Sequence, residues 1–122
     1  MTMPFSPKPN KFKLNKEFRR MYGRGKCLVD PSLVTYIIRS GRKDFRLGIT
    51  SGKKIGGAVQ RNRARRIIAA AYRDVIKEIK YPIDVVFVAR SRILSLKSNE
   101  VASIMRQQFI KEGLIEDPEQ TL

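Results

Sequence analysis

Residues 45–89, "FRLGITSGKKIGGAVQRNRARRIIAAAYRDVIKEIKYPIDVVFVA", contain the part of the chain that decides its fold. Apolar residues alternate with polar or small ones over 45–50, which is typical of a half-buried strand, and the apolar run 83–89 favours a buried strand. Between them, residues 58–80 have the periodicity of a helix. A strand, a long helix and a strand in this order predict a crossover unit.

The two sides of this predicted helix differ in chemistry. An apolar stripe, which we expect to face the sheet, contains Ala64, Ile67, Ile68, Ala71, Tyr72 and Val75. The opposite side combines small and basic residues: Ala58, Asn62, Arg65, Arg66, Ala69 and Arg73. Alanine lets a partner come close, and a planar guanidinium can bind phosphate through two hydrogen bonds. The outward side is therefore expected to contact a nucleic acid.

The rest of the chain completes an α+β domain. We expect a short helix from Asn15 to Gly23, a strand within 25–29, and a helix from about 98 to 112 that ends at Gly113. The segments 33–38 and 45–50 are predicted to pair as an antiparallel hairpin. The predicted fold is a two-layer sandwich of a small mixed four-stranded sheet with about three helices, two of them on one face and the short first helix near the other.

The domain organisation follows from length and composition. With 122 residues, 42% of them hydrophobic, the chain is long enough for one modest core. We expect a flexible segment at 1–10, where three prolines occur, a single α+β domain at 11–115, and an acidic tail at 116–122.

The net charge points to the kind of partner. The chain has 26 Lys and Arg against 11 Asp and Glu, a formal charge of +15. Residues 8–26 contain eight cations and one acid, and residues 39–66 contain ten cations and one acid. Such clustering implies a polyanionic partner.

The composition also limits the chemistry. Cys27 is the single cysteine and there is no histidine, so an intrachain disulfide and a Cys/His metal site are excluded. Histidine is also the commonest general base, and its absence favours a binding protein over a catalyst. No run of about 20 apolar residues and no signal peptide is evident, so we expect a cytoplasmic protein without a membrane partner.

Three other functions fit part of this pattern. A small ribosomal protein would be equally basic and would co-purify with ribosomal subunits. A DNA-binding regulator is disfavoured, because a strand and a glycine loop, not a helix and a short turn, precede the basic helix. A nuclease acting alone would cleave RNA in Mg²⁺ without an RNA partner.

The stretch "KKIGGAVQRNRARR" (53–66) closely resembles the signature of the protein subunit of bacterial ribonuclease P, whose centre is the triplet "RNR" (61–63). The resemblance extends to "NKEFRRMYGRGK" (15–26), "LVTYII" (33–38), "FRLGIT" (45–50) and "VVFVAR" (85–90). Two positions depart from the family pattern: Ala69 replaces a usual basic residue, and Gly57 replaces a larger polar one.

The resemblance implies a ribosomal protein S5 domain 2-like fold and a role in removing the 5′ leader of precursor tRNA. In this family the RNA subunit is the catalyst and holds the required Mg²⁺, so no catalytic residue, no metal ligand and no protein-bound cofactor is expected in this chain. The implied partners are ribonuclease P RNA and precursor tRNA, and no DNA is expected.

The resemblance also implies two RNA-facing surfaces. The first would bind the catalytic RNA through Lys53, Lys54, Arg61, Asn62, Arg63, Arg65, Arg66 and Arg73. The second is a cleft for the single-stranded leader, with Lys11, Lys13, Phe18, Arg19, Tyr22, Tyr36 and Arg46. Because bases stack on aromatic rings, Phe18 and Tyr22 are expected to be partly exposed.

Overall fold

The computed structural model describes residues 10–12, 15–39, 41 and 43–118. Its strands are β1 (Asn10–Lys11), β2 (Lys26–Val29), β3 (Leu33–Arg39), β4 (Arg46–Thr50) and β5 (Ile83–Ala89). Its α-helices are α1 (Asn15–Arg24), α2 (Ala58–Val75) and α3 (Ser98–Lys111), and 3₁₀ turns occur at Lys53–Ile55, Ile76–Glu78 and Ser91–Ser95.

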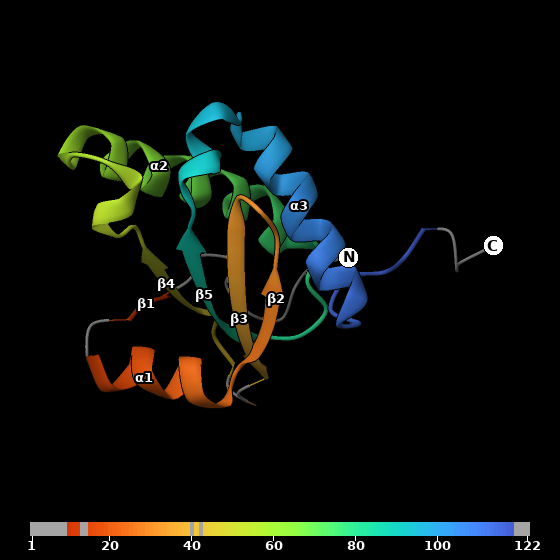
Figure 1. Ribbon diagram of the computed structural model, residues 1–122. Coiled ribbons are helices and arrows are strands. Elements are labelled where there is room, and N and C mark those ends of the chain that lie inside the picture. The colour runs from red at the N-terminus through yellow and green to blue at the C-terminus, as the bar shows by residue number, and fades with distance from the viewer. Residues whose placement is uncertain (1–9, 13–14, 40, 42, 119–122) are drawn as a thin grey trace.

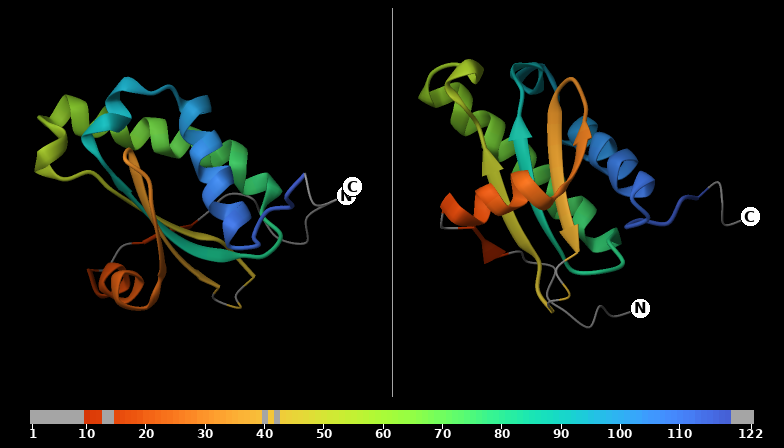
Figure 2. Two further views of the ribbon diagram at one scale, coloured as in Figure 1. Left: turned by 45° about the vertical axis from the view of Figure 1, so that its right-hand side comes forward. Right: turned by 60° about the horizontal axis from the view of Figure 1, so that its bottom comes forward.

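The strands form one mixed sheet in the order β1-β4-β5-β3-β2. Helices α2 and α3 cover one face, and α1 crosses the other (Figures 1 and 2). Strands β4 and β5 are parallel and are joined through α2, so the predicted crossover unit is confirmed. The predicted α+β sandwich is also confirmed, and the two-residue strand β1 adds to the edge of its four main strands by pairing with β4.

The predicted hairpin between 33–38 and 45–50 is wrong. Strand β5 lies between β3 and β4, parallel to β4 and antiparallel to β3, and the hairpin partner of β3 is β2. The physical reason is the composition of β5: six of its seven residues are buried, so it is stabilised by strands on both edges. The most apolar strand therefore takes the central position.

The main core lies between the sheet and the helices α2 and α3. The predicted inward stripe of α2 is confirmed, because Ala64, Ile68, Ala71, Tyr72 and Val75 are all buried. The α-helix ends at Val75, not near Lys80 as predicted, and tightens into the 3₁₀ turn Ile76–Glu78. Side chains three residues apart eclipse in such a turn, and Ile76 and Ile79 are both buried here.

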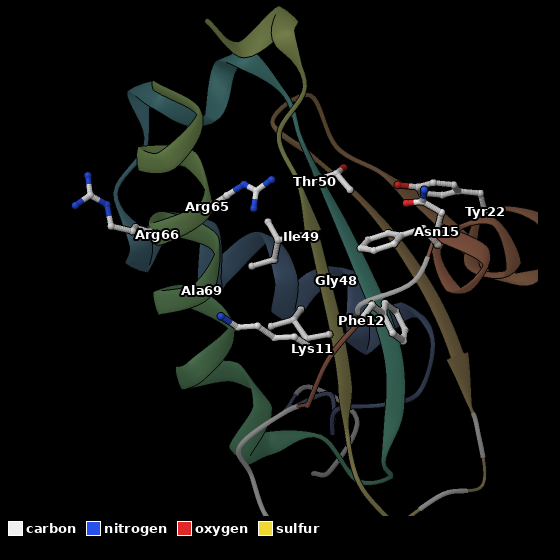
Figure 3. A pocket seen from close by; sticks show the side chains of 12 residues that line it. Lys11, Phe12, Asn15, Tyr22, Gly48, Ile49, Thr50, Arg65, Arg66 and Ala69 are labelled. Atoms are coloured by element: carbon white, nitrogen blue, oxygen red, sulfur yellow. The ribbon is translucent and has the colours of Figure 1, made fainter. Parts of the chain in front are cut away.

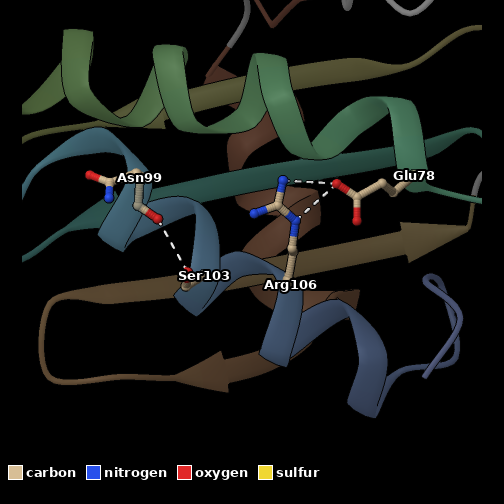
Figure 4. A network of polar contacts seen from close by, with 4 residues as sticks. All are labelled: Glu78, Asn99, Ser103 and Arg106. Carbon is tan, nitrogen blue, oxygen red and sulfur yellow. Dashed lines mark hydrogen bonds and ion pairs between the residues drawn. The ribbon is translucent and has the colours of Figure 1, made fainter. Parts of the chain in front are cut away.

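Polar contacts fix α3 against its neighbours. The buried Gln108 side chain accepts a hydrogen bond from the Thr35 hydroxyl at 2.5 Å and donates one to the Leu33 carbonyl at 3.3 Å. Arg106 binds Glu78 through two nitrogens, at 2.8 and 2.9 Å, and so joins α3 to the 3₁₀ turn that follows α2 (Figure 4). These contacts position the layer that contains α2.

Helix α1 packs on the opposite face over a second, smaller apolar cluster. Phe12, Met21 and Val86 are its buried members, and Phe18 and Tyr36 pack against it. Arg20 forms an ion pair with the buried Asp84 of β5 at 3.6 Å. A small core and a few polar contacts therefore hold α1 in place.

The ends of the chain are described in part. Residues 1–9 and 119–122, most of the predicted N-terminal segment and part of the predicted tail, lie outside the described residues. Leu114 and Ile115 are buried, and Glu116, the first residue of the predicted tail, forms an ion pair with Lys80 at 3.4 Å. In the described part of the chain, no helix combines the length and the apolar character that a membrane span needs.

Candidate RNA-binding surfaces

The outward side of α2 presents most of the predicted catalytic-RNA residues. Asn62, Arg63, Arg66 and Arg73 are exposed there, Arg65 is exposed but points toward the sheet, and Arg61 is half-buried. None of these arginines forms an ion pair within residues 10–12, 15–39, 41 and 43–118. Their charge is therefore available to an anionic partner.

Two adjacent arginines of α2 point in different directions. Arg65 points toward β4, where its Nε donates a hydrogen bond to Ser51 Oγ at 3.0 Å, whereas Arg66 points away from the sheet (Figure 3). Ser51, Arg61, Asn62 and Arg65 line a cavity of about 390 Å³ beside the first turns of α2. Ser51 therefore holds the Arg65 guanidinium in place, whereas the Arg66 guanidinium is free to contact a partner.

The predicted lysines lie in the turn before α2. Lys53 and Lys54 are exposed, and the buried Ile55 anchors the turn to the core. Both lysines line a groove of about 650 Å³ together with Arg90 and Arg92, which follow β5. Sequence reasoning missed these two arginines, and the signal that could have found them is the position of "RSR" (90–92) directly after a buried strand.

An aromatic groove lies between α1 and the sheet. Phe18 and Tyr22 of α1 line this groove, whose volume is about 630 Å³. The Tyr22 and Tyr36 rings meet edge to face with centroids 5.0 Å apart, and Phe12 and Phe18 do so at 5.6 Å. Phe18 is half-buried and Tyr22 is 41% exposed, so the predicted partial exposure of both rings is confirmed.

The floor of this groove depends on a residue without a side chain. A Cβ atom on Gly48 of β4 would lie 2.6 Å from Phe18 Cε1 and 2.8 Å from Phe12 Cδ2. The two rings therefore rest directly on the β4 backbone. Phe12, Asn15 and Thr50 also line the groove, and sequence reasoning missed all three together with Gly48.

Arg46 supports the groove from within. Its guanidinium lies over the Phe12 ring, 4.5 Å from the centroid, and forms an ion pair with Glu17 of α1. Only 14% of its side chain is exposed. The geometry makes Arg46 a link between β4, Phe12 and α1.

The other predicted leader residues have different positions. Lys11 is exposed and lines the groove, and Tyr36 contacts Tyr22 from β3. Arg19 is exposed on α1 outside the groove lining, and Lys13 lies outside the described residues. A hydrogen bond with Cys27, and then partial burial, raise the pKa of Tyr36 above its ordinary value, so its phenol stays neutral to a higher pH than a free tyrosine.

The structure also brings the two predicted surfaces together. The aromatic groove is lined on its far side by Arg65, Arg66 and Ala69 of α2, which lie across β4 from Tyr22 (Figure 3). Ala69, where the family usually has a basic residue, therefore lies at this junction. Among the residues that the structure describes, no three acids or cysteines gather where they could hold a metal ion.

Taken together, the mixed sheet, the unpaired arginines of α2 and the aromatic groove define a small basic RNA-binding protein of the α+β class. The chain belongs to the ribonuclease P protein family, because the family model described as "Ribonuclease P" matches its residues 6–112. It is thus a component of ribonuclease P, an endoribonuclease holoenzyme of tRNA processing, and a partner of ribonuclease P RNA.

Similar proteins support this assignment. The chain is 37% identical over 108 residues to the ribonuclease P protein component of Clostridium botulinum (strain Loch Maree / Type A3), covering 88% of this chain and 97% of that protein. It is 31% identical over 106 residues to that of Alkaliphilus oremlandii, covering 87% and 93%.

Solved structures agree in fold. The Staphylococcus aureus RNase P protein superposes with a TM-score of 0.75 at 25% identity, covering 89% of this chain and 100% of that one. The Thermotoga maritima RNase P protein has a TM-score of 0.73 at 22% identity, with coverages of 88% and 99%.

Proposed function

We propose that this protein binds the catalytic RNA of ribonuclease P through α2 and the 5′ leader of precursor tRNA through the aromatic groove. The observation that supports this division most directly is the different chemistry of the two surfaces. Among the described residues, the outward face of α2 has arginines without an ion pair and no aromatic ring, whereas the groove has the partly exposed rings of Phe18 and Tyr22 and a glycine, Gly48, in its floor.

The face of α2 suits a structured RNA. Arg63, Arg66 and Arg73 can neutralise phosphates, and Asn62 can hydrogen-bond to a ribose hydroxyl or a base edge. Lys53 and Lys54 extend this charge at the start of the helix, beside Arg90 and Arg92. These contacts fix position and orientation without requiring a particular base sequence.

The aromatic groove suits a single strand. A base that stacks on an exposed ring gains about 1–3 kcal/mol, whichever base it is, because each base has a π-face. Phe18 and Tyr22 are one helical turn apart and can serve neighbouring bases, while Lys11 lies close enough to contact the strand's phosphates. Such a groove tolerates precursor tRNAs with different leaders.

The two proposed RNA-binding surfaces adjoin at the edge of β4, so the two RNAs would lie next to each other there. Arg65 and Arg66 line the same groove as the aromatic rings, so a leader leaving the rings would pass next to the RNA bound to α2. The protein would thereby hold the leader beside the catalytic RNA. The cleavage chemistry, with its Mg²⁺, would belong to the RNA.

Reconstitution tests this proposal. The protein is mixed with a bacterial ribonuclease P RNA and a precursor tRNA at low Mg²⁺, and cleavage at the mature 5′ end is followed over time. We expect the protein to stimulate cleavage, and to do so more for a precursor with a leader of about ten nucleotides than for one with a single leader nucleotide. No stimulation would exclude the proposed function, and cleavage without the RNA would make the protein itself a nuclease.

A further inference from the structure

The most exposed large hydrophobic side chain of the described residues lies in the first turn of α2. Val59 is 75% exposed, more than Val29 at 68%, Tyr81 at 47% or Tyr22 at 41%. Two of the others have evident partners, since Tyr22 meets Tyr36 and Tyr81 lies under Arg39. Val59 has no evident partner of this kind among the residues that the structure describes.

The surroundings of Val59 are those of the proposed RNA-binding face. On a helix the neighbours of residue 59 are residues 62 and 63, which here are the exposed Asn62 and Arg63, and one turn further lies Arg66. Helical side chains lean toward the N-terminus, so Asn62 and Arg63 extend over the flanks of Val59. Figure 1 shows this first turn at the end of α2 that is farther from α3.

We propose that Val59 packs against the sugar and base surface of a nucleotide of the catalytic RNA. This inference rests on the proposed function of α2 and adds to it a contact without charge. The base faces and sugar C–H groups of a nucleotide are apolar, and bases in the loops of a folded RNA are free to meet a side chain. A β-branched valine is stiff about its first side-chain torsion and loses little entropy in such a contact.

The charged and polar residues near Val59 indicate which partner packs against it. Asn62 and Arg63 are the helical neighbours of Val59 and Arg66 lies one turn further, so the partner must present anions and hydrogen-bonding groups beside an apolar patch, as a nucleotide does. The catalytic RNA is the RNA that α2 is proposed to bind. The leader is proposed to bind in the aromatic groove, so its contacts are expected there and not at Val59.

Two substitutions separate an apolar contact from general electrostatics. In Val59→Lys the net charge rises by one, so a purely electrostatic surface would bind RNA more tightly. If Val59 packs on a nucleotide, the same change inserts a strongly hydrated ammonium into an apolar contact. We then expect about five- to tenfold weaker binding to ribonuclease P RNA, and about threefold weaker binding for Val59→Ala.

The chain provides a matched control. Val29→Lys adds the same charge at a similarly exposed valine, but on β2, at the opposite edge of the sheet from β4. Its affinity for the RNA should equal or slightly exceed that of the wild type. Thermal unfolding of all three variants should match the wild type because both valines are exposed.

Salt dependence gives a second, independent readout. A contact without charge displaces no counterion, so Val59→Ala should lower the affinity at every salt concentration and leave the slope of log affinity against log salt unchanged. Affinity is measured by filter binding with labelled ribonuclease P RNA, and a leader oligonucleotide serves as a second ligand that Val59 variants should bind normally.

The possible results are distinguishable. Weaker RNA binding by Val59→Lys than by Val29→Lys, with an unchanged slope for Val59→Ala, would support the inference. Equal or tighter binding by Val59→Lys would overturn it and leave the proposed function intact. A wild-type protein that does not bind the RNA at all would overturn both.

Discussion

Gly48 lies directly beneath the ring of Phe18, so close that a Cβ atom at position 48 would come within 2.6 Å of Phe18 Cε1. The same hypothetical Cβ atom would lie 2.8 Å from Phe12 Cδ2. Strand β4 thus has a glycine, which lacks a side chain, at the point where α1 must approach the sheet. A side chain at position 48 would therefore displace rings that border the groove between α1 and β4.

Gly48→Ala should therefore change both stability and leader binding. The added methyl group displaces the Phe18 and Phe12 rings, and overpacking of this kind typically costs about 1–3 kcal/mol. We expect a lower free energy of unfolding in urea and about tenfold weaker binding of a fluorescent leader oligonucleotide, with little change in affinity for ribonuclease P RNA.

The control for this substitution is Gly23→Ala in α1. A Cβ atom there would meet nothing within 4 Å, and alanine favours a helix over glycine by roughly 0.5–1 kcal/mol. Gly23→Ala should stabilise the protein without weakening leader binding. If Gly48→Ala left both unfolding and leader binding unchanged, the rings would not rest on β4 as described.

Much of the fold follows from periodicity along the chain. The inward stripe of α2, from Ala64 to Val75, and the strand β5 could be predicted because each has a regular apolar pattern over many residues. The pairing of strands could not be predicted in the same way. Strands 33–38 and 45–50 are neighbours in sequence, and nothing local shows that β5, more than 30 residues later, inserts between them.

The candidate site was predictable where charge or aromatic character marks a residue, as for Arg66 and Tyr22. It was not predictable where a residue acts through its neighbours. Gly48 matters only because two rings from other segments converge on it, and Arg46, a predicted leader residue, contacts Glu17 and Phe12, which its sequence position does not indicate. Such roles arise from tertiary contacts, which a single sequence does not display.

Arg46→Lys separates a structural role of Arg46 from direct phosphate binding. Lysine keeps the charge but lacks the planar group that covers the Phe12 ring. We expect a loss of roughly 0.5–1 kcal/mol of stability and about threefold weaker leader binding. Both are measurable by urea unfolding and fluorescence anisotropy.

The comparison for this variant is Arg19→Lys, at an exposed site on α1 that has no ion pair among the described residues. It should leave stability unchanged. Full leader affinity in Arg46→Lys would instead indicate that only the charge of Arg46 matters, as in a direct contact with phosphate.

Arg66→Ala tests the α2 surface through its salt dependence. If the protein engages about six phosphates, log affinity for ribonuclease P RNA should fall against log salt with a slope of about −4 to −5. Arg66 is exposed and points away from the sheet, so its loss should weaken binding and reduce the magnitude of the slope by roughly 0.7–0.9.

Lys111→Ala is the control for charge, because it removes one exposed cation from the last turn of α3. It should change neither the slope nor the affinity appreciably. Relative to the wild type, Arg66→Ala should lose far more affinity for the catalytic RNA than for an isolated leader oligonucleotide. Equal losses for both ligands would contradict the assignment of α2 to the catalytic RNA.

Tyr72→Phe tests the core beneath helix α2. The Tyr72 ring packs against Phe87 and Phe109, with centroids 5.1 and 6.3 Å away, and its buried hydroxyl has no hydrogen-bond partner in the described part of the chain. Burial of such a hydroxyl costs free energy, so its removal should leave stability unchanged or raise it by about 1 kcal/mol at pH 7.

The same substitution has a pH signature. Burial, and then the nearby Asp84 carboxylate, raise the pKa of Tyr72 far above its ordinary value of 10.0. Above about pH 10 the unfolded chain loses this proton while the folded protein keeps it, so the wild type should lose about 1.4 kcal/mol of stability per pH unit through this group. Tyr72→Phe lacks that loss, and the difference between the two unfolding free energies, measured in urea from pH 8 to 11, should widen only above pH 10. A difference that stays constant over this range would show that the hydroxyl ionises equally in both states, and therefore that α2 does not bury it.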